Sequence, residues 1–401
     1  MGLTNPSEEQ PQCLSKKLIS FTFCSLLSIA LIQFHFSATP FSFSSTEQLL
    51  RNKPVAVSTT ITTTTSSSSS SSSSKEEERA KVQIACDYNN GKWIPDKLGP
   101  IYNGTNCGIV TNYQDCMTNG RPDLVYLHWK WKPNQCNIPS YNTGDKKIHD
   151  KFRRWHFPSH NLNVSIYWSP FLVRGIERRR FKDYCRLYLD SLDEQWAPDL
   201  DQMDMIVISF GHWLPQPSLY FFGDSAQGCH KCTGLNYTEA GIYGVFQKII
   251  KTTIDKVIDG RGGGDGKGID VIVTTFSPHH FEGEWDKFGA CSRTQPFKEG
   301  EKRLEGMEVE MRRIAVAEVE AAKMKAKEFR KRIRLGVLDV TKLSLMRGDG
   351  HPGPYRVANP FANGVKERVK NDCTHWCVLG LVDTWNEILL DIINRWENNG
   401  F

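Results

Sequence analysis

The stretches Met205-Ile-Val-Ile-Ser209 and Ile269-Asp-Val-Ile-Val273 decide the fold class of this chain. Both are short and almost continuously apolar, which is typical of strands buried on both faces of a parallel sheet. Val164-Ser-Ile-Tyr-Trp168 and Leu335-Gly-Val-Leu-Asp339 are further strand candidates of the same kind. The sequence therefore predicts a sheet built from short hydrophobic strands.

Helix-like stretches occur among these strands, at residues 240–258, 306–334 and 382–396. In the last stretch, apolar side chains recur at helical spacing from Trp385 to Trp396 and form one stripe, as in a helix with one buried face. Thr384 and Glu387 fit a capping box at the start of this stretch. Strands that alternate with helices predict an α/β fold, with a parallel sheet and flanking helices.

The first part of the chain differs in composition from the rest. Residues 18–36 form a mostly apolar run without a formal charge, which as a helix spans about 28 Å, close to the thickness of a bilayer's hydrocarbon core. Lys16 and Lys17 precede this run, so we expect a cytosolic tail at residues 1–17 and translocation of the remainder. A cleaved signal peptide that ends near Ala38 is the alternative. Residues 37–81, rich in serine and threonine, predict a flexible stalk.

Cysteines and glycosylation sequons agree with a translocated domain. Ten of the 12 cysteines occur from Cys86 onward, and an even number in such a compartment predicts disulfides. Asn103, Asn163 and Asn236 each begin a sequon for N-glycosylation. We divide this part into a Cys- and Trp-rich N-terminal lobe at residues 86–139, stapled by disulfides, and a larger α/β domain at residues 140–401.

The net charge of the chain is modest, at +5. Its basic clusters, such as Arg178-Arg-Arg180, lack the aromatic motifs that stack on bases. These clusters predict a solvated surface, and no nucleic-acid partner is expected.

The strongest candidate for catalysis is the segment Asn371-Asp-Cys-Thr-His-Trp-Cys377. On a helical turn, Asp372 and His375 lie on one face within reach of each other. A carboxylate that fixes one imidazole nitrogen leaves the other nitrogen to act as a general base. Disulfides formed by Cys373 and Cys377 would pin this turn. A structural turn in which Asp372 only caps the chain is the alternative interpretation.

A general base needs a nucleophile beside it, and Gly223-Asp-Ser225 matches the tripeptide that carries the serine of GDSL-type esterases. In that fold the serine follows a buried strand and begins a helix. Here the tripeptide is followed by a glycine, a close cysteine pair and Thr233-Gly234, which together indicate a loop. We therefore interpret Ser225 as a turn residue.

Several other side chains are candidates for contact with substrate. The loop at residues 277–285 follows a predicted strand end and carries His280, as a hydrogen-bonded organiser, and Trp285. Gly211 follows another strand end and is a candidate oxyanion-hole amide, while Trp213 is a candidate for stacking on sugar rings. Burial in the core is the alternative for each tryptophan.

Two further clusters have simpler interpretations. Cys229-His-Lys-Cys232 and the pair Cys373 and Cys377 could be combined into a zinc site, but an oxidising compartment favours disulfides, so no metal site is expected. Arg347-Gly-Asp-Gly-His-Pro352 predicts a turn, from which Asp349 and His351 would support the site.

Short motifs occur along the chain in a fixed order. They are Cys86-Asp-Tyr88, Gly91-Lys-Trp93, Asn119-Gly-Arg-Pro-Asp123, Trp129-Lys-Trp131, Arg154-Trp-His-Phe-Pro158, Trp168-Ser-Pro-Phe171, Ser209-Phe-Gly-His-Trp213, Gly228-Cys-His-Lys-Cys232, Asp349-Gly-His-Pro352 and Asp383-Thr-Trp385. Together with residues 277–285 and 372–377, these motifs resemble the trichome-birefringence-like family of plant cell-wall polysaccharide O-acetyltransferases. They are most similar to the subgroup that acts on xyloglucan.

The resemblance implies an SGNH/GDSL-like fold in which Asp372 and His375 are the catalytic pair. It implies transfer of acetyl groups to a cell-wall polysaccharide, with no bound cofactor but with an acetyl donor derived from acetyl-CoA. It also implies a single-pass type II protein of the Golgi membrane, held by its N-terminal anchor, with the catalytic domain in the lumen.

The chain departs from the family pattern at one place. Family members carry a strand that ends in a GDS serine between a Cys-x-x-Pro element, here Cys136-Asn-Ile-Pro139, and the Arg-Trp-His-Phe element that begins at Arg154. Here only residues 140–153 (SYNTGDKKIHDKFR) join the two elements, without an apolar strand. We expect that the nucleophile, its strand and helix, and a cysteine partner for the N-terminal lobe are missing, which leaves Cys185 as an odd thiol.

This departure leaves alternatives for the function. Acetyl transfer to xyloglucan is expected of an intact family member, and greatly reduced or absent transfer is expected of this chain, as for a splice form or an incomplete gene model. A non-catalytic member that binds glycan or supports other acetyltransferases is the second hypothesis. A secreted esterase that removes acetyl groups is the third.

Overall fold

The computed structural model describes residues 86–100, 113–138, 152–157, 161–180, 183–261, 268–329 and 332–399, which belong to one compact unit. The predicted anchor at 18–36, the stalk at 37–81, the sequon at Asn103 and most of the 140–153 connection lie outside these ranges. Within the described ranges, no helix has both the length and the apolar character needed to cross a bilayer.

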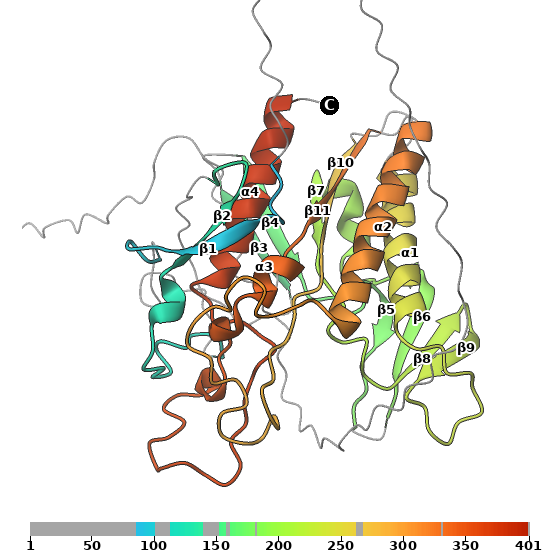
Figure 1. Ribbon diagram of the computed structural model, residues 1–401. Coiled ribbons are helices and arrows are strands. Elements are labelled where there is room, and N and C mark those ends of the chain that lie inside the picture. Colours follow the sequence, from blue (N-terminus) through green and yellow to red (C-terminus); the bar gives the residue numbers. More distant parts are fainter. Residues whose placement is uncertain are drawn as a thin grey trace, which may run out of the picture. The chain divides into compact units, whose positions relative to one another are not determined.

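The central element is a three-stranded parallel sheet of β7 (Met205–Ile208), β10 (Ile269–Thr274) and β11 (Ile333–Leu338), in the order β11-β10-β7. Val271 of β10 pairs with Ile206 on one side and Leu335 on the other. All six residues of β10 are buried, as the continuous apolar sequence predicts for a central parallel strand. The parallel strands expected at these three stretches are confirmed (Figure 1).

The two faces of this sheet contact different hydrophobic clusters. Val271 and Val273 belong to the larger cluster, whereas Ile272 between them belongs to a second one. The helices that cover the sheet are α1 (Tyr243–Arg261) and α2 (Gly306–Glu328), which lie side by side and join the first cluster, and α4 (Leu381–Asn399), which joins the second (Figure 1). The period of two along β10 therefore gives a sheet with helices on both sides.

The apolar stripe of the last helix is confirmed, but the predicted capping box is wrong. Trp385 is fully buried, and Ile388 and Ile393 pack in the same cluster. The helix begins at Leu381, so Thr384 lies inside it and cannot be its N-cap. The backbone N–H of Gly380 instead donates to the Asp383 carboxylate at 2.6 Å.

Two other predicted boundaries also differ from the structure. The helix expected at residues 306–334 ends at Glu328, and the chain enters β11 at Ile333. The strand expected at residues 164–168 is β4 (Leu162–Tyr167), which pairs antiparallel with β3 (Phe152–Phe157) and is not part of the parallel sheet. Its burial alternates along the strand, and this pattern is typical of an antiparallel hairpin with one covered face.

A second, mixed sheet has the order β5-β6-β8-β9, with bounds β5 (Val173–Ile176), β6 (Cys185–Leu192), β8 (Ser218–Phe222) and β9 (Ser225–His230). β6 and β8 are parallel, and the outer pairs are antiparallel. Cys185 at the start of β6 is buried and forms no disulfide, as expected for an odd thiol. Burial raises the pKa of this thiol, so it is an unreactive core residue.

The N-terminal lobe contributes the antiparallel pair β1 (Gly91–Pro95) and β2 (Trp129–Pro133). A Cβ at Gly91 would lie 2.6 Å from the carbonyl oxygen of Lys132, so only glycine fits at this approach. A disulfide joins Cys86 to Cys136 across the base of the pair. The remaining short helices are η1 (Val125–Leu127), η3 (Ala197–Gln202), α3 (Thr341–Leu345), η4 (Gly348–Gly350) and η5 (Pro354–Arg356).

Candidate active site

Polar side chains meet beyond the carboxyl ends of β7 and β10, which are neighbours in the parallel sheet. His212 follows β7, and its Nε2–H donates to the carbonyl oxygen of Ser277, which follows β10, at 3.0 Å. The His212 ring stacks on Phe276 with 4.1 Å between ring centroids. Removal from water lowers the pKa of His212 to about 4, and the charges of His375 and His279 act in the same direction. His212 is therefore a neutral donor near neutral pH.

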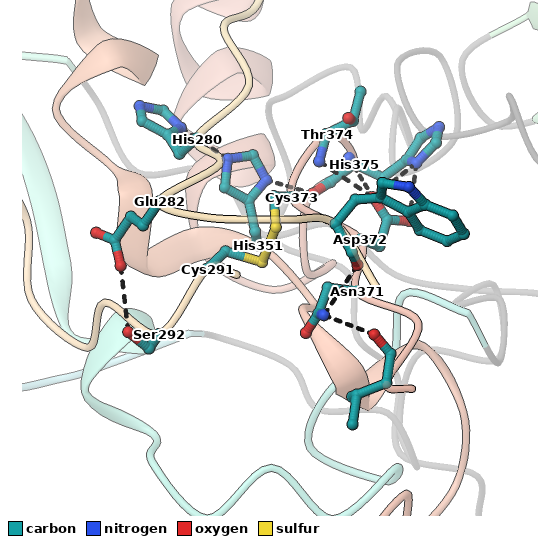
Figure 2. The surroundings of a disulfide bond; sticks show 12 residues. His280, Glu282, Cys291, Ser292, His351, Asn371, Asp372, Cys373, Thr374 and His375 are labelled. Carbon is teal, nitrogen blue, oxygen red and sulfur yellow. Dashed lines mark hydrogen bonds and ion pairs between the residues drawn. A yellow bond between two sulfur atoms is a disulfide. The ribbon is translucent and has the colours of Figure 1, made fainter. Parts of the chain in front are cut away.

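Asp372 and His375 form the predicted pair. His375 Nδ1 lies 2.9 Å from Asp372 Oδ2 and 3.1 Å from Oδ1, while the backbone N–H of His375 donates to Oδ1 at 2.9 Å (Figure 2). The Asp372 side chain is 4% exposed and that of His375 is 18% exposed. The carboxylate thus holds the proton on Nδ1 and makes Nε2 the basic nitrogen of a partly accessible ring.

The charge state of Asp372 follows from the same contacts. Burial acts to raise its pKa, but the charge and hydrogen bond of the His375 ring outweigh burial, together with the backbone N–H groups of Thr374 and His375. The pKa of Asp372 is therefore held well below its usual range, and the carboxylate remains ionised. An ionised carboxylate stabilises an imidazolium when His375 accepts a proton.

Backbone bonds and disulfides fix this segment on both sides. Asp372 and Gly353 exchange backbone hydrogen bonds at 2.9 Å in each direction. Cys373 is joined to Cys291, and Cys377 is joined to Cys116. The disulfides expected to pin the turn are therefore present.

Buried arginines hold the neighbouring turn of η4. Arg347 and Asp349 form an ion pair at 2.8 Å in which both side chains are fully buried. Arg121 donates to the carbonyl oxygens of Asp349 at 2.8 Å and His351 at 2.9 Å. Asp349 and His351 support the site in two ways. Asp349 neutralises Arg347, and the ring of His351 contacts the His375 carbonyl oxygen at 2.6 Å.

The other predicted contact residues lie in different surroundings. His280 is buried, and its ring nitrogens face His351 and the carbonyl oxygen of Leu345. Trp285 is half-buried, and its carbonyl oxygen accepts from the backbone N–H of Asn371 at 3.1 Å. Trp213 is 8% exposed and packs edge to face against Trp168. Of the two interpretations of this residue, burial in the core is therefore the one that the structure supports.

Gly211 has a φ of 127°, a backbone conformation that favours glycine. A Cβ at this position would lie 3.1 Å from Met311 Cε and 3.2 Å from Phe276 Cδ2. The structure thus explains why glycine is needed after β7, and the proposed oxyanion-hole role stays a prediction.

The tripeptide Gly223-Asp-Ser225 lies at the β8–β9 hairpin. Phe222 and Ser225 are paired across it, with Gly223 at a φ of 57° in the turn between them. The turn is therefore confirmed, but the loop expected after it is wrong, because residues 225–230 form β9. The exposed Ser225 begins this antiparallel strand and does not begin a helix.

The cysteine pair after Ser225 forms the disulfide Cys229–Cys232. Within the described part of the chain, Cys229, Cys232 and Glu239 are the group of side chains close enough together to bind a metal ion. Both sulfurs, however, belong to the disulfide. Asn163 and Asn236, the described sequon asparagines, are both exposed.

Sequence reasoning did not single out His212 or Ser277 as a pair. A usable signal is present: each follows a buried strand of one parallel sheet, and carboxyl ends of neighbouring strands lie together. The link between His280 and His351 had no such signal, because 71 residues separate them in the chain.

Comparisons with known proteins place these residues in a family. Residues 133–392 match the PC-Esterase model, described as the GDSL/SGNH-like acyl-esterase family found in Pmr5 and Cas1p, and residues 84–137 match the PMR5 N-terminal domain. The chain belongs to the PC-esterase family.

Relatives of this PC-esterase chain include named acetyltransferases. Xyloglucan O-acetyltransferase 1 of Populus trichocarpa is 47% identical over 428 residues, which cover 96% of this chain and 95% of the relative. Xyloglucan O-acetyltransferase 1 of Arabidopsis thaliana is 41% identical over 99% of this chain and 100% of its own length. Protein trichome birefringence-like 25 of Arabidopsis thaliana is 35% identical over 78% of each. The resemblance inferred from the motifs is confirmed.

We expect Asp372→Asn to lower the free energy of unfolding of this PC-esterase chain by about 1–3 kcal/mol at neutral pH, because the substitution breaks a buried hydrogen-bond network. Since folding depresses the pKa of Asp372, its contribution is fully present above the unfolded value of about 3.9 and is lost as pH falls through the folded value. Denaturant unfolding of both proteins between neutral pH and pH about 3 checks this. A stability difference that grows on acidification would contradict it.

Proposed function

We propose that this chain is built as an O-acetyltransferase for a plant cell-wall polysaccharide, with xyloglucan as the substrate. The observation that carries the proposal is the contact between His375 Nδ1 and Asp372 at 2.9 Å, within a PC-esterase domain. Three relatives between 41% and 48% identical are named xyloglucan O-acetyltransferases and cover most of the chain, which supports this substrate.

The proposed chemistry uses His375 as the base. A sugar hydroxyl gives its proton to His375 Nε2, and its oxygen forms a new bond to the acetyl carbon. The bond between that carbon and the group that carried the acetyl breaks, and the leaving oxygen or sulfur takes the proton back from His375. Asp372 stabilises the imidazolium between these two events. The acetyl donor is a compound derived from acetyl-CoA, and no resident cofactor is needed.

Two observations support the view that the serine-bearing strand is missing. The alignment with Xyloglucan O-acetyltransferase 1 of Populus trichocarpa extends over 428 residues, more than the 401 residues of this chain, so the relative has residues without a counterpart here. In the described part of the chain, β7 pairs with β10 alone although its sequence is wholly apolar. A further strand beside β7 would complete a parallel sheet of the usual kind.

A second function follows from this gap. Without the serine, a chain that retains the His375–Asp372 pair and the glycan-facing loops would bind xyloglucan or support other acetyltransferases without turnover. The half-buried Trp285, whose carbonyl oxygen accepts a hydrogen bond from the backbone N–H of Asn371, is the aromatic residue that we propose for contact with a sugar.

The cellular setting belongs to the same proposal. Residues 18–36 would anchor the protein in the Golgi membrane as a single-pass type II protein, with the catalytic domain in the lumen. Disulfides and exposed sequon asparagines suit an oxidising, glycosylating compartment. Asn103, Asn163 and Asn236 would then carry glycans.

The experiment is an acetyl-transfer assay on xyloglucan oligosaccharides, with glycan binding measured in parallel on the same preparation. We expect binding with little or no transfer, and release of acetate from acetylated xyloglucan would instead indicate an esterase. Ser225→Ala is the matched control, since Ser225 is an exposed residue at the start of β9. Strong transfer that survives this substitution would contradict the missing nucleophile, and absence of both binding and transfer would contradict the proposed substrate.

A further inference from the structure

Two buried histidines from distant parts of the sequence meet beside the catalytic pair. His280 Nδ1 lies 2.7 Å from His351 Nε2, and the two residues are 5% and 3% exposed (Figure 2). The remaining nitrogen of each ring faces a backbone carbonyl. His280 Nε2 lies 2.9 Å from the Leu345 oxygen, and His351 Nδ1 lies 2.6 Å from the His375 oxygen.

These contacts determine where the protons must be. A carbonyl oxygen only accepts hydrogen bonds, so His280 Nε2 and His351 Nδ1 both carry hydrogen. A neutral imidazole carries one N–H, and two neutral rings would therefore place two lone pairs face to face at 2.7 Å. Rotating either imidazole ring by 180° would place a ring carbon, in place of the N–H, against the carbonyl oxygen that now accepts a hydrogen bond. The arrangement needs one more proton than two neutral rings possess.

We propose that His280 and His351 share one proton between Nδ1 of the first and Nε2 of the second, and that this buried cation positions His375 and opposes its protonation. The shared proton turns a repulsive contact into a charge-assisted hydrogen bond. A bridging zinc ion does not fit, because nitrogens bound to one tetrahedral zinc at about 2.0–2.1 Å lie roughly 3.3 Å apart. The effect on His375 rests on the proposed function, but the proton count does not.

The surroundings contain stabilising partners for one positive charge. Trp376 stacks on the His351 ring with 4.0 Å between centroids, and an indole face attracts a cation. The Asp372 carboxylate also favours the charged form of His351. The cationic groups that oppose the charge are His375 at His351, and His279, Arg293 and Lys302 at His280.

Burial opposes any positive charge on the two rings. It lowers the pKa of His280 to about 4 and that of His351 well below its ordinary value, and the His280 charge lowers the pKa of His351 further. Two imidazolium rings in contact are therefore excluded. A single shared proton has to be held against burial by the hydrogen bond at 2.7 Å, in which both rings carry the charge.

The link to His375 runs through the backbone and through charge. His351 Nδ1–H donates to the His375 carbonyl at 2.6 Å, while the backbone N–H of His280 donates to Cys373 at 2.9 Å. His280 and His351 are therefore hydrogen-bonded to the backbone of the 372–375 turn. The charge of the pair opposes a second charge on His375, as the repulsion between His351 and His375 indicates. His375 is thereby kept neutral, which is the form that a general base requires.

The test is nuclear magnetic resonance of the full chain in detergent micelles, labelled with 15N-histidine, which is tractable because the chain has 11 histidines. We expect one far-downfield exchangeable proton near neutral pH that is coupled to nitrogens of two rings. His280→Asn and His351→Asn should each remove it, whereas the matched exposed-site variant His128→Asn should keep it. A wild-type spectrum with one N–H proton on each ring and no third would overturn the shared proton, whether or not any variant folds.

Two further readouts separate this role from simple packing. In His280→Asn, the His375 titration midpoint should move to higher pH, and an unchanged midpoint would overturn the link to His375. The folding equilibrium constant of wild type, relative to the double variant His280→Asn/His351→Asn, should fall up to about tenfold per pH unit as pH rises above the unfolded value of about 6.5. A neutral pair would show no change in relative stability above this pH, because neither the folded nor the unfolded state would then bind a proton at the two rings. These readouts need no acetyl transfer, so failure of the proposed function is distinguishable.

Discussion

We expect acetyl transfer to xyloglucan oligosaccharides to rise about 10⁶-fold when residues 140–153 are replaced by the corresponding stretch of Xyloglucan O-acetyltransferase 1 from Populus trichocarpa. The physical reason is that a base without its nucleophile retains only the catalysis provided by binding and electrostatics. The grafted strand and serine would lie beside β7, whose carboxyl end leads to Gly211 and His212. Initial rates of labelled acetyl transfer on equal amounts of folded protein measure the gain.

Two matched variants of the grafted protein test the assignment. Changing the grafted GDS serine to alanine, or His375→Ala, should each return the rate to that of the ungrafted chain, whereas Ser225→Ala should leave it unchanged. The effects of the first two should not add, because the serine and the histidine act in one step. A folded graft without transfer, or one that tolerates His375→Ala, would contradict the proposed base.

Removal of the disulfide between Cys116 and Cys377 should lower the free energy of unfolding by about 6 kcal/mol, because its partners are 261 residues apart and the loop it closes is long. The double variant Cys116→Ala/Cys377→Ala avoids a leftover thiol. A domain has only about 5–15 kcal/mol of stability, so this variant should be close to unfolding at room temperature. Denaturant titration followed by near-ultraviolet circular dichroism measures the loss.

The matched control is Cys229→Ala/Cys232→Ala, which removes a disulfide across a sequence separation of 3. The same loop-entropy relation gives about 2 kcal/mol for this short loop, so the two variants should differ by roughly 4 kcal/mol. Equal losses would show that chain entropy is not the source of the stabilisation.

The parallel sheet could be predicted from sequence because its strands are apolar on both faces. Val271, Ile272 and Val273 are all buried, and few other structures accommodate such a run. The strand at Val164 was assigned to the wrong sheet, because a short apolar run does not say which strand it pairs with. The capping residue of α4 was assigned wrongly, because Asp383, and not Thr384, accepts the hydrogen bond at that end.

Within the site, the contact between Asp372 and His375 could be predicted because three residues on one turn bring side chains together regardless of tertiary structure. The His280–His351 contact could not, because it depends on loops after β10 and before α4 that only the complete fold brings together. Trp213 shows the same limit. The sequence left both a contact with sugar and burial in the core open for this residue, and it packs against Trp168.

The disulfide between Cys116 and Cys377 also sets the order of events during synthesis. Because 261 residues separate the two cysteines, a ribosome adding about 5–20 residues per second needs roughly 13–50 s to deliver the second after the first. Throughout that interval the nascent chain carries Cys116 without its partner, close in sequence to other cysteines with which it could pair wrongly. A nascent chain that stops before Cys377 therefore never closes this bridge, and the turn bearing His375 is among the last parts of the protein to be secured.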